Sequence, residues 1–322
     1  MKRLLYVVHR YAPFPGGSEN YVRDMAEESV RRGHEVWVFT GTHKGNNING
    51  VNVTSDSSIL GTPFDLIIVH GGDVGVQDFV LRQAQHIPSP ILFMLILPSN
   101  SDLYKRASKN VAFVGCSTEE DWEWVDANCQ GRGVQVRHGI DMKKAIGVDG
   151  FKKKFGIDTE YMFLSCGGYW QNKAMKELVD LFNQLGRTDV TMVTTGYALD
   201  PSLIPQDSRY VKNLILDDRQ DVLNALLEAD LYVMHSFKEG FGLVLLEAMV
   251  NLTPWAARYN AGARLMRDYG FTYKEDQQLL QFMRDYRTPK NYDVLIPRKR
   301  YAMENHLISN TVDDIMRLID DK

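Results

Sequence analysis

The amino-acid sequence predicts an α/β protein with two parallel β-sheets, each covered by helices on both faces. Short apolar segments alternate with amphipathic segments along almost the whole chain, and this alternation starts afresh after residue 150. Strands that are apolar on both faces and separated by helices are typical of parallel sheets buried on both sides. A chain of 322 residues is also long enough for two domains of ordinary size.

The predicted strands are the apolar runs, which are Leu4–Val8, Val36–Thr40, Leu66–His70, Ile91–Leu97, Val111–Gly115, Met162–Cys166, Val190–Thr195, Leu231–His235 and Pro254–Arg258. Helices are predicted where apolar residues recur on one face, and a glycine often follows the last turn. Such stripes occur at Val22–Ser29, Leu178–Leu185 and Ile308–Ile319.

The apolar periodicity is interrupted between Asp141 and Phe155, where glycines and lysines accumulate. We place the domain boundary there. The predicted first domain spans residues 1–145, the second spans 146–303, and 304–322 form a final helix.

Composition restricts the class of protein. Apolar residues make up 44 % and charged residues 24 % of the chain, which is the balance of a soluble globular protein. No long apolar run or signal peptide is seen, so we expect a cytoplasmic protein without an integral membrane segment. A net charge of −4 exerts no general attraction on nucleic acid. The three cysteines are too widely spaced for a zinc or disulfide pattern, and no DxD-like acidic pair follows a strand, so neither metal nor cofactor is expected.

Two loops of the first half carry candidate binding groups. Gly16 and Gly17 directly follow the first strand, where backbone amides at a helix start would approach an anion, although an ordinary turn has the same composition. His70 ends the third predicted strand. It would donate to a sugar hydroxyl or a phosphate, or it would simply be satisfied by nearby backbone.

Two loops of the second half carry charged candidates. Lys173 follows the Gly167-Gly168 pair at a predicted helix start, where a cation opposes the helix dipole; this favours a bound anion over a lysine that points into solvent. Glu239 and Glu247 bracket a Gly240-Phe241-Gly242 turn. Glu247 falls among apolar residues that include Leu243, so its carboxylate needs partners such as ribose or sugar hydroxyls.

The segment from Ser236 to Glu247 resembles the Glu-x7-Glu signature of retaining glycosyltransferases with the GT-B fold, notably glycosyltransferase family 4. Further segments across nearly the whole chain are similar to the same family, namely Gly16-Gly17-x-Glu19, Arg32–Val36, His70, His138–Asp141 and Ala229–Leu231. The sequence departs from the family at Gly168, where an arginine usually stands beside the phosphates.

The resemblance implies two Rossmann-like domains that face a central cleft. Residues 1–145 would form the acceptor side, and 146–303 would bind the nucleotide-sugar donor, a UDP-sugar or GDP-sugar. The donor would lie against Gly16, Gly17, Gly168, Lys173, Gly240, Phe241, Gly242, Leu243 and Glu247. Glu239 would contact the sugar hydroxyls, Glu247 the ribose and Lys173 the diphosphate, and His70 would face the donor. Transfer would proceed by front-face displacement without a protein nucleophile, and the final helix would cross back to the first domain.

Other functions stay open at this stage. The same architecture would suit a nucleotide-sugar epimerase, and the missing arginine at Gly168 would suit a pseudoenzyme that binds without transfer. Paired carboxylates also occur in glycoside hydrolases, although a glutamate on a helix of a nucleotide-type fold argues against that reading.

The acceptor is open among a soluble glycan, a lipid-linked glycan and a modified nucleic-acid base. Candidate acceptor-side residues are Glu19, Lys105, Arg106 and Lys109, the last three on a predicted helix over Ser101–Lys109. That basic face would receive phosphates of a polyanionic acceptor, or it is only a solvated surface. The acidic segment Glu119–Trp124 disfavours an anionic membrane surface.

Overall fold

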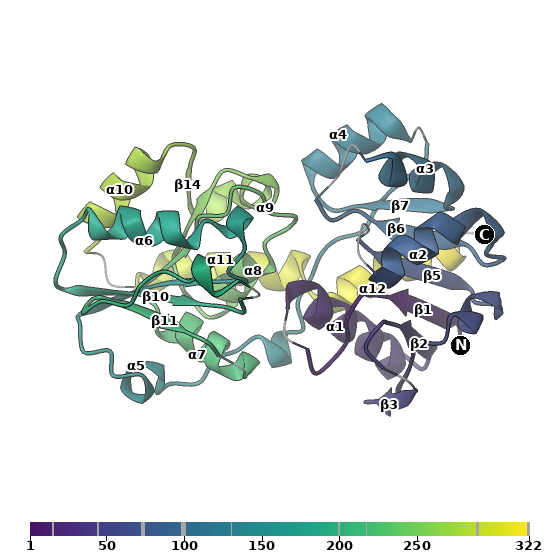
Figure 1. Ribbon diagram of the computed structural model, residues 1–322, viewed down its shortest axis with the longest axis horizontal. Helices are drawn as coiled ribbons and strands as arrows, with labels where there is room; N and C mark the ends of the chain where they lie inside the picture. Colours follow the sequence, from purple (N-terminus) through teal and green to yellow (C-terminus); the bar gives the residue numbers. More distant parts are fainter. Residues whose placement is uncertain are drawn as a thin grey trace. The chain divides into compact units, whose positions relative to one another are not determined.

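The predicted α/β class is confirmed by a computed structural model that describes residues 1–14, 16–43, 45–71, 75–97, 101–129, 131–198, 200–216, 218–287 and 290–320. The chain forms two compact units, and each contains one mostly parallel sheet (Figure 1). Unit 1 comprises Met1–Asp141 with Asn305–Lys322, and unit 2 comprises Met142–Glu304. No helix within the described residues is long and apolar enough to cross a membrane.

Unit 1 contains an eight-stranded sheet in the order β3-β4-β2-β1-β5-β6-β7-β8, in which β3 with β4 forms the antiparallel pair. Its strands are β1 Arg3–Val7, β2 Glu35–Phe39, β3 Asn46–Ile48, β4 Val51–Thr54, β5 Leu66–His70, β6 Ile91–Met94, β7 Phe113–Cys116 and β8 Gly133–Gln135. Its helices are α1 Gly17–Arg31, α2 Gly75–Gln83, α3 Asp102–Asn110, α4 Glu119–Asn128 and α12 Ile308–Asp320.

The strands of unit 1 send alternate side chains to two buried layers. Leu5 and Val7 of β1 join a core cluster with residues of α2, α3 and α4. Tyr6 points the other way, and its hydroxyl bonds the Ser29 hydroxyl of α1 at 2.8 Å. Helix α1 in turn packs against α12. This two-sided burial explains why the strands are apolar throughout rather than alternating.

A cluster of buried aromatic rings lies where α1 meets the sheet of unit 1. The Tyr21 ring stacks on His138 with centroids 4.7 Å apart and lies 5.1 Å from the ring of His70. His306 adds a bond from its Nδ1 to the His138 carbonyl oxygen at 2.8 Å. Burial lowers the pKa of His70 to about 4 and that of His138 to about 3. Both rings are therefore neutral at physiological pH.

Unit 2 contains a six-stranded parallel sheet in the order β11-β10-β9-β12-β13-β14. Its strands are β9 Tyr161–Cys166, β10 Val190–Thr195, β11 Val211–Leu214, β12 Leu231–Met234, β13 Trp255–Arg258 and β14 Phe271–Tyr273. Its helices are α5 Phe151–Lys154, α6 Met175–Asn183, α7 Arg219–Glu228, α8 Leu243–Val250, α9 Ala261–Leu265, α10 Asp276–Asp285 and α11 Tyr292–Asn305.

Helices cover both faces of the unit 2 sheet. In Figure 1, α6 and α10 lie on one face, and α5 and α7 lie on the other. The first pair contributes Leu178, Phe182, Leu279 and Met283 to a core cluster with strand residues such as Phe163. The apolar stripes predicted at Val22–Ser29, Leu178–Leu185 and Ile308–Ile319 are thus confirmed as helices, although α6 ends before Leu185.

Five strands were missed by sequence reasoning, and one was predicted too long. β3, β8, β11 and β14 are edge strands of three or four residues with partly exposed side chains, so they carry no apolar run. β4 alternates buried and half-buried residues instead. The run from Ile91 ends as a strand at Met94 because the chain then turns, and Leu97 has a φ of 56°.

We expect the buried histidines to make unit 1 acid-labile. From pH 6.5 toward pH 4, the unfolded chain takes up protons on His70 and His138 while the folded chain does not, so the free energy of unfolding falls. The loss at pH 5 is on the order of 2 kcal/mol per histidine. The free energy of unfolding of unit 1 is measured at pH 7.5 and at pH 5 by urea titration, with hydrogen exchange of unit 1 amides as the probe.

The double variant His70→Asn/His138→Asn should lose less stability across that interval than the parent, and His86→Asn, on the surface, should behave as the parent. An unchanged pH dependence in the double variant would show that these rings do not control acid lability.

Candidate active site

The strand order creates one switch point in each sheet, which the sequence alone did not show. In unit 2 the chain leaves β9 toward β10 and β11 on one side and returns to β12 on the other. In unit 1 the corresponding pair is β1 and β5. Ligands of open parallel sheets bind beyond the carboxyl ends of the strands at such points, because the flanking loops diverge there. The predicted donor-binding residues follow β1, β9 and β12, and His70 ends β5.

In unit 2 the loops after β9 and β12 are tied together. The Phe237 backbone N–H donates to the Asn172 carbonyl oxygen at 2.8 Å. Lys173 Nζ lies 2.5 Å from a carboxylate oxygen of Glu239. The lysine side chain is 22 % exposed, so it lies at the site instead of extending into solvent. Two residues that were singled out separately in the sequence therefore form one ion pair.

The structure corrects the placement of Lys173. It ends a 3-10 turn, Gln171–Lys173, and does not belong to the first turn of α6, which begins at Met175. Ala174 separates the two with a φ of 52°. The helix dipole therefore does not oppose this cation as expected, because dipole effects fall off beyond the terminal turn. Its ion pair with Glu239 accounts for its position instead.

Glu247 lies in the second turn of α8, and its side chain is only 6 % exposed. The partner that its burial requires is Arg219, whose Nη2 lies 2.5 Å from a Glu247 carboxylate oxygen. Arg219 is the first residue of α7, after the N-cap Asp218. A buried carboxylate of this kind is stabilised by a charge-assisted hydrogen bond.

The two ion pairs converge at the end of β9, around the buried thiol of Cys166. Burial and, after it, the Glu247 carboxylate raise the pKa of Cys166 to about 12. Lys173 and Arg219 act in the opposite direction on the same thiol. All three charged groups are therefore near enough to Cys166 to affect its ionisation, which places them around one point of the sheet edge.

The turn between the two glutamates leads directly into α8. Gly240 is partly buried, the Phe241 ring is buried, and Gly242 is the N-cap residue with a φ of 76°, a conformation that favours glycine. No side chain caps this helix end, which starts at Leu243. Its first amides are thus directed beyond the carboxyl end of β12, where an anion would be stabilised.

Gly168 has a packing reason to lack a side chain. A Cβ atom at this position would come within 1.9 Å of the Trp170 indole nitrogen. The indole thus occupies the space that a longer residue would need, and its ring lies 6.4 Å from the exposed ring of Tyr197 after β10. An arginine at 168 would require this loop to rearrange.

At the switch point of unit 1, Gly16 is the N-cap of α1 and has no side-chain cap, and Gly17 has open space around its Cα. Pro15 lies outside the described residues. Glu19 in the first turn of α1 is buried, and its Oε1 accepts from Arg10 at 2.9 Å and lies 3.1 Å from His9. The carboxylate therefore has partners within unit 1.

His70 ends β5 beside the same switch point, but its residue is only 4 % exposed. Its Nδ1 has no hydrogen-bond partner among the described residues. The alternative that nearby backbone groups satisfy the ring by hydrogen bonds is thus not seen at Nδ1. Gly72, which follows in the sequence motif, lies outside the described residues.

The basic residues proposed for the acceptor lie on α3, which starts after the N-cap Ser101. Its inner face is formed by Leu103, Tyr104, Ala107 and Ser108. Arg106 and Lys109 are exposed and Lys105 is half-exposed, so the three lie on the outer side of the helix. Trp124 of the acidic helix α4 is buried in the core and is not available to a membrane.

Sequence reasoning missed Arg219 as a member of the site. The signal was present, because a cation in the first turn of a helix runs against the dipole preference. Asp217 before it lies outside the described residues. A metal cluster is a separate question: within the described part of the chain, no three His, Cys, Asp or Glu side chains gather as potential ligands.

Comparisons with known proteins identify the architecture. Residues 160–282 match the family described as glycosyl transferases group 1. None of the curated protein sequences matches the chain.

Solved structures match along the whole length. Sucrose-phosphate synthase from Thermosynechococcus elongatus is 14 % identical with a TM-score of 0.81, covering 100 % of this chain and 99 % of its own. Anabaena HepE in complex with UDP-glucose is 16 % identical with a TM-score of 0.80, covering 100 % of both chains. An α,α-trehalose-phosphate synthase from Burkholderia xenovorans is 14 % identical with a TM-score of 0.76, covering 99 % and 100 %. The family match thus lies within unit 2, and the chain as a whole shares the two-domain GT-B fold of these solved structures.

Proposed function

We propose that the chain is a retaining glycosyltransferase that takes a hexose or related sugar from a nucleoside-diphosphate sugar without a divalent metal. The observation that carries this proposal is the meeting of Lys173, Glu239, Arg219 and Glu247 at the switch point of unit 2. UDP-sugars are the first donors to test, because the structurally similar HepE was solved with UDP-glucose.

The four charged groups sum to zero, so a diphosphate would replace carboxylates as the partner of the cations. Lys173 would exchange its Glu239 contact for a phosphate oxygen, which leaves Glu239 to accept hydrogen bonds from sugar hydroxyls. The uncapped start of α8 adds amide donors for the same phosphates. Glu247 would then accept from the ribose hydroxyls in its buried position.

Arg219 would supply the second cation of this site. The family usually places an arginine at the position of Gly168, and Trp170 fills that space here. Arg219 reaches Glu247 from α7, on the other side of the β9 end. A guanidinium offers a fork of donors that suits both carboxylate and phosphate, so it would hold Glu247 and bind a phosphate oxygen together.

Transfer would occur on one face of the sugar. The acceptor oxygen forms a bond to the anomeric carbon as the bond to the diphosphate oxygen breaks, and the acceptor proton passes to the departing diphosphate. Charge then develops on the phosphate, next to Lys173, Arg219 and the α8 amides, which stabilise it more than the ground state. Gly16 and Gly17 would lie near phosphate and acceptor, and His70 would face the donor, as the resemblance implies.

A second candidate function is a protein that binds nucleotide-sugar without transferring it, which the glycine at 168 favours. An epimerase of the same architecture would instead need an additional redox cofactor or a second reaction of the released sugar. Slow donor hydrolysis separates an active transferase from a binder, because water replaces the missing acceptor.

UDP should raise the melting temperature of the protein, since a ligand that binds only the folded state stabilises it by mass action. Hydrolysis of labelled UDP-glucose, and of other nucleotide-sugars if it is inert, should persist in EDTA. Loss of both effects in EDTA with recovery in manganese would overturn the metal-independent mechanism.

Substitutions of Glu239, Glu247 and Arg219 should affect sugar transfer and nucleotide binding differently. Glu239→Gln should slow transfer at least tenfold and leave UDP binding intact, because it removes the sugar contact. Glu247→Gln should weaken uridine and UDP alike, and Arg219→Gln should weaken UDP more than uridine. Each change removes a charged hydrogen bond worth about 1.5–3 kcal/mol. Calorimetric titration with both ligands and single-turnover transfer measure these effects.

Glu177→Gln, on the exposed side of α6, is the matched control and should change neither quantity. Parental binding and transfer in all three site variants would place the active site elsewhere.

The acceptor is proposed to be polyanionic, a phosphorylated glycan or a nucleic acid among them, because three basic residues share the outer side of α3. Changing Lys105, Arg106 and Lys109 to Gln should lower transfer, flatten its salt dependence and leave donor hydrolysis unaffected, since phosphate contacts release counterions. Transfer rates with heparin-like glycans and RNA at several salt concentrations measure this. An unchanged salt slope would make this surface a solvated face and nothing more.

A further inference from the structure

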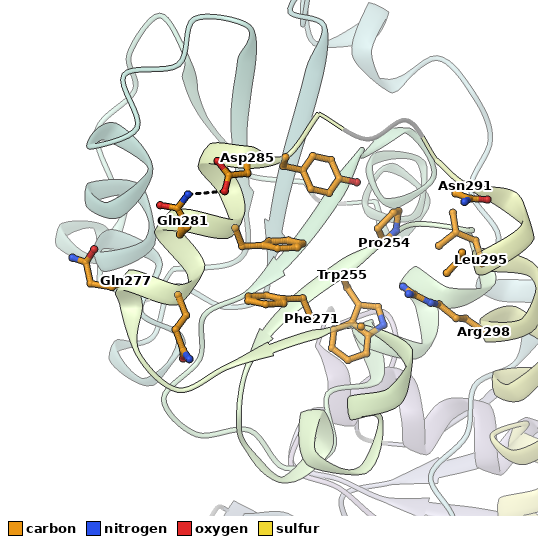
Figure 2. A pocket seen from close by; sticks show the side chains of 14 residues that line it. Pro254, Trp255, Phe271, Gln277, Gln281, Asp285, Asn291, Leu295 and Arg298 are labelled. Atoms are coloured by element: carbon orange, nitrogen blue, oxygen red, sulfur yellow. Dashed lines mark hydrogen bonds between the residues drawn. The ribbon is translucent and has the colours of Figure 1, made fainter.

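An apolar groove of about 950 Å³ lies in unit 2, at the edge of the sheet formed by β14. α10 forms one wall and α11 the other, and its floor is the start of β13 and β14 (Figure 2). Trp255 is the first residue of β13 and Phe271 the first of β14, and Pro254 and Gly270 come directly before them. The groove thus opens at the amino ends of these strands, whereas the charged site lies beyond the carboxyl ends.

The groove walls are built mainly from aromatic and aliphatic side chains. The Phe271 ring stacks on Phe282 of α10 with centroids 4.1 Å apart and an angle of 4° between the rings. Leu295 lines the opposite wall, and Val294 beside it is 44 % exposed. Aromatic walls of this kind bind flat apolar groups through dispersion and the removal of surface from water.

Two nitrogen donors at one end of the groove have no hydrogen-bond acceptor among the described residues. Trp255 is 1 % exposed, and its Nε1 has no hydrogen-bond partner among the described residues. Figure 2 shows that this nitrogen edge of the indole lies on the side of the Arg298 guanidinium. Arg298 is partly buried and burial lowers its pKa, and its guanidinium makes no ion pair or hydrogen bond with another described residue.

The groove's own carboxylate does not satisfy these donors. Asp285 is the acidic residue of the lining, and it accepts from Gln281 at 2.6 Å on α10 (Figure 2). A buried donor without a partner lowers the stability of the fold, and a partly buried cation without one lowers it further. Both costs are relieved together by one anionic acceptor placed between Trp255 and Arg298.

We propose that this groove binds a small amphipathic anion, with an aromatic or aliphatic body between α10 and α11 and a carboxylate, sulfonate or phosphate at Trp255 Nε1 and Arg298. The donors of Trp255 and Arg298 favour an anionic head group, and the stacked rings of Phe271 and Phe282 favour an apolar body. The groove is distinct from the proposed donor site, so its occupancy does not depend on glycosyl transfer.

The test uses 1-anilinonaphthalene-8-sulfonate as the anionic probe and N-phenyl-1-naphthylamine as its neutral relative, both titrated by fluorescence in saturating UDP. The parent should bind one sulfonate probe per chain. Arg298→Gln should weaken the sulfonate at least tenfold and change binding of the neutral amine less than twofold. Arg300→Gln, an exposed neighbour on α11 outside the groove, is the matched control and should match the parent.

Val294→Trp should abolish binding of both probes, because it fills the groove from an exposed position and leaves the core intact. Circular dichroism and thermal unfolding verify that each variant is folded. Sulfonate binding that is absent, that has no defined stoichiometry, or that falls equally in Arg298→Gln and Arg300→Gln would overturn the proposal. Binding that survives in Val294→Trp would place the probe outside the groove and overturn it as well.

Discussion

The central position of β9 in the unit 2 sheet determines where its charged residues meet. β9 pairs in parallel with β10 on one side and β12 on the other, so the loops that follow β9 and β12 leave the same edge of the sheet together. Lys173 and Glu239 are far apart in the sequence, and this pairing brings them to within 2.5 Å of each other. If β12 paired elsewhere, the same residues would have no reason to interact. The β9 pairing therefore underlies both the ion pairs and the function proposed for them.

The charged residues at the end of β9 form neutral pairs. Buried or half-buried charges are costly to leave unpaired, and pairing Lys173 with Glu239 and Arg219 with Glu247 reduces that cost. In the proposed function, a diphosphate would take the place of a carboxylate as the partner of these cations. Pairing also explains why Glu247 tolerates a helix position among apolar neighbours.

Local packing determines which residues can lie beside Gly168. The Trp170 indole lies where a side chain at position 168 would have to leave the backbone, and the second cation comes instead from the start of α7. In the proposed function, Arg219 would supply the positive charge that the resemblance places at Gly168. At the opposite end of the sheet, the groove at Trp255 is lined mainly by apolar side chains, and the Trp255 Nε1 donor has no acceptor among the described residues. One sheet thus carries a charged edge and an apolar edge.

The α/β class and most buried strands were determined by the sequence itself, because strands buried on both faces must be apolar throughout, and Leu66–His70 was predicted to the residue. Edge strands such as β14 were not predictable, since half-exposed strands carry no such constraint. Glu247 and Lys173 were recognised because their charges conflict with a local preference. The partners of these residues were not recognised. Strand order decides that Lys173 pairs with Glu239 and that Arg219 pairs with Glu247. Strand order is a long-range property, decided by how helices and strands pack in three dimensions, and no local pattern of residues encodes it.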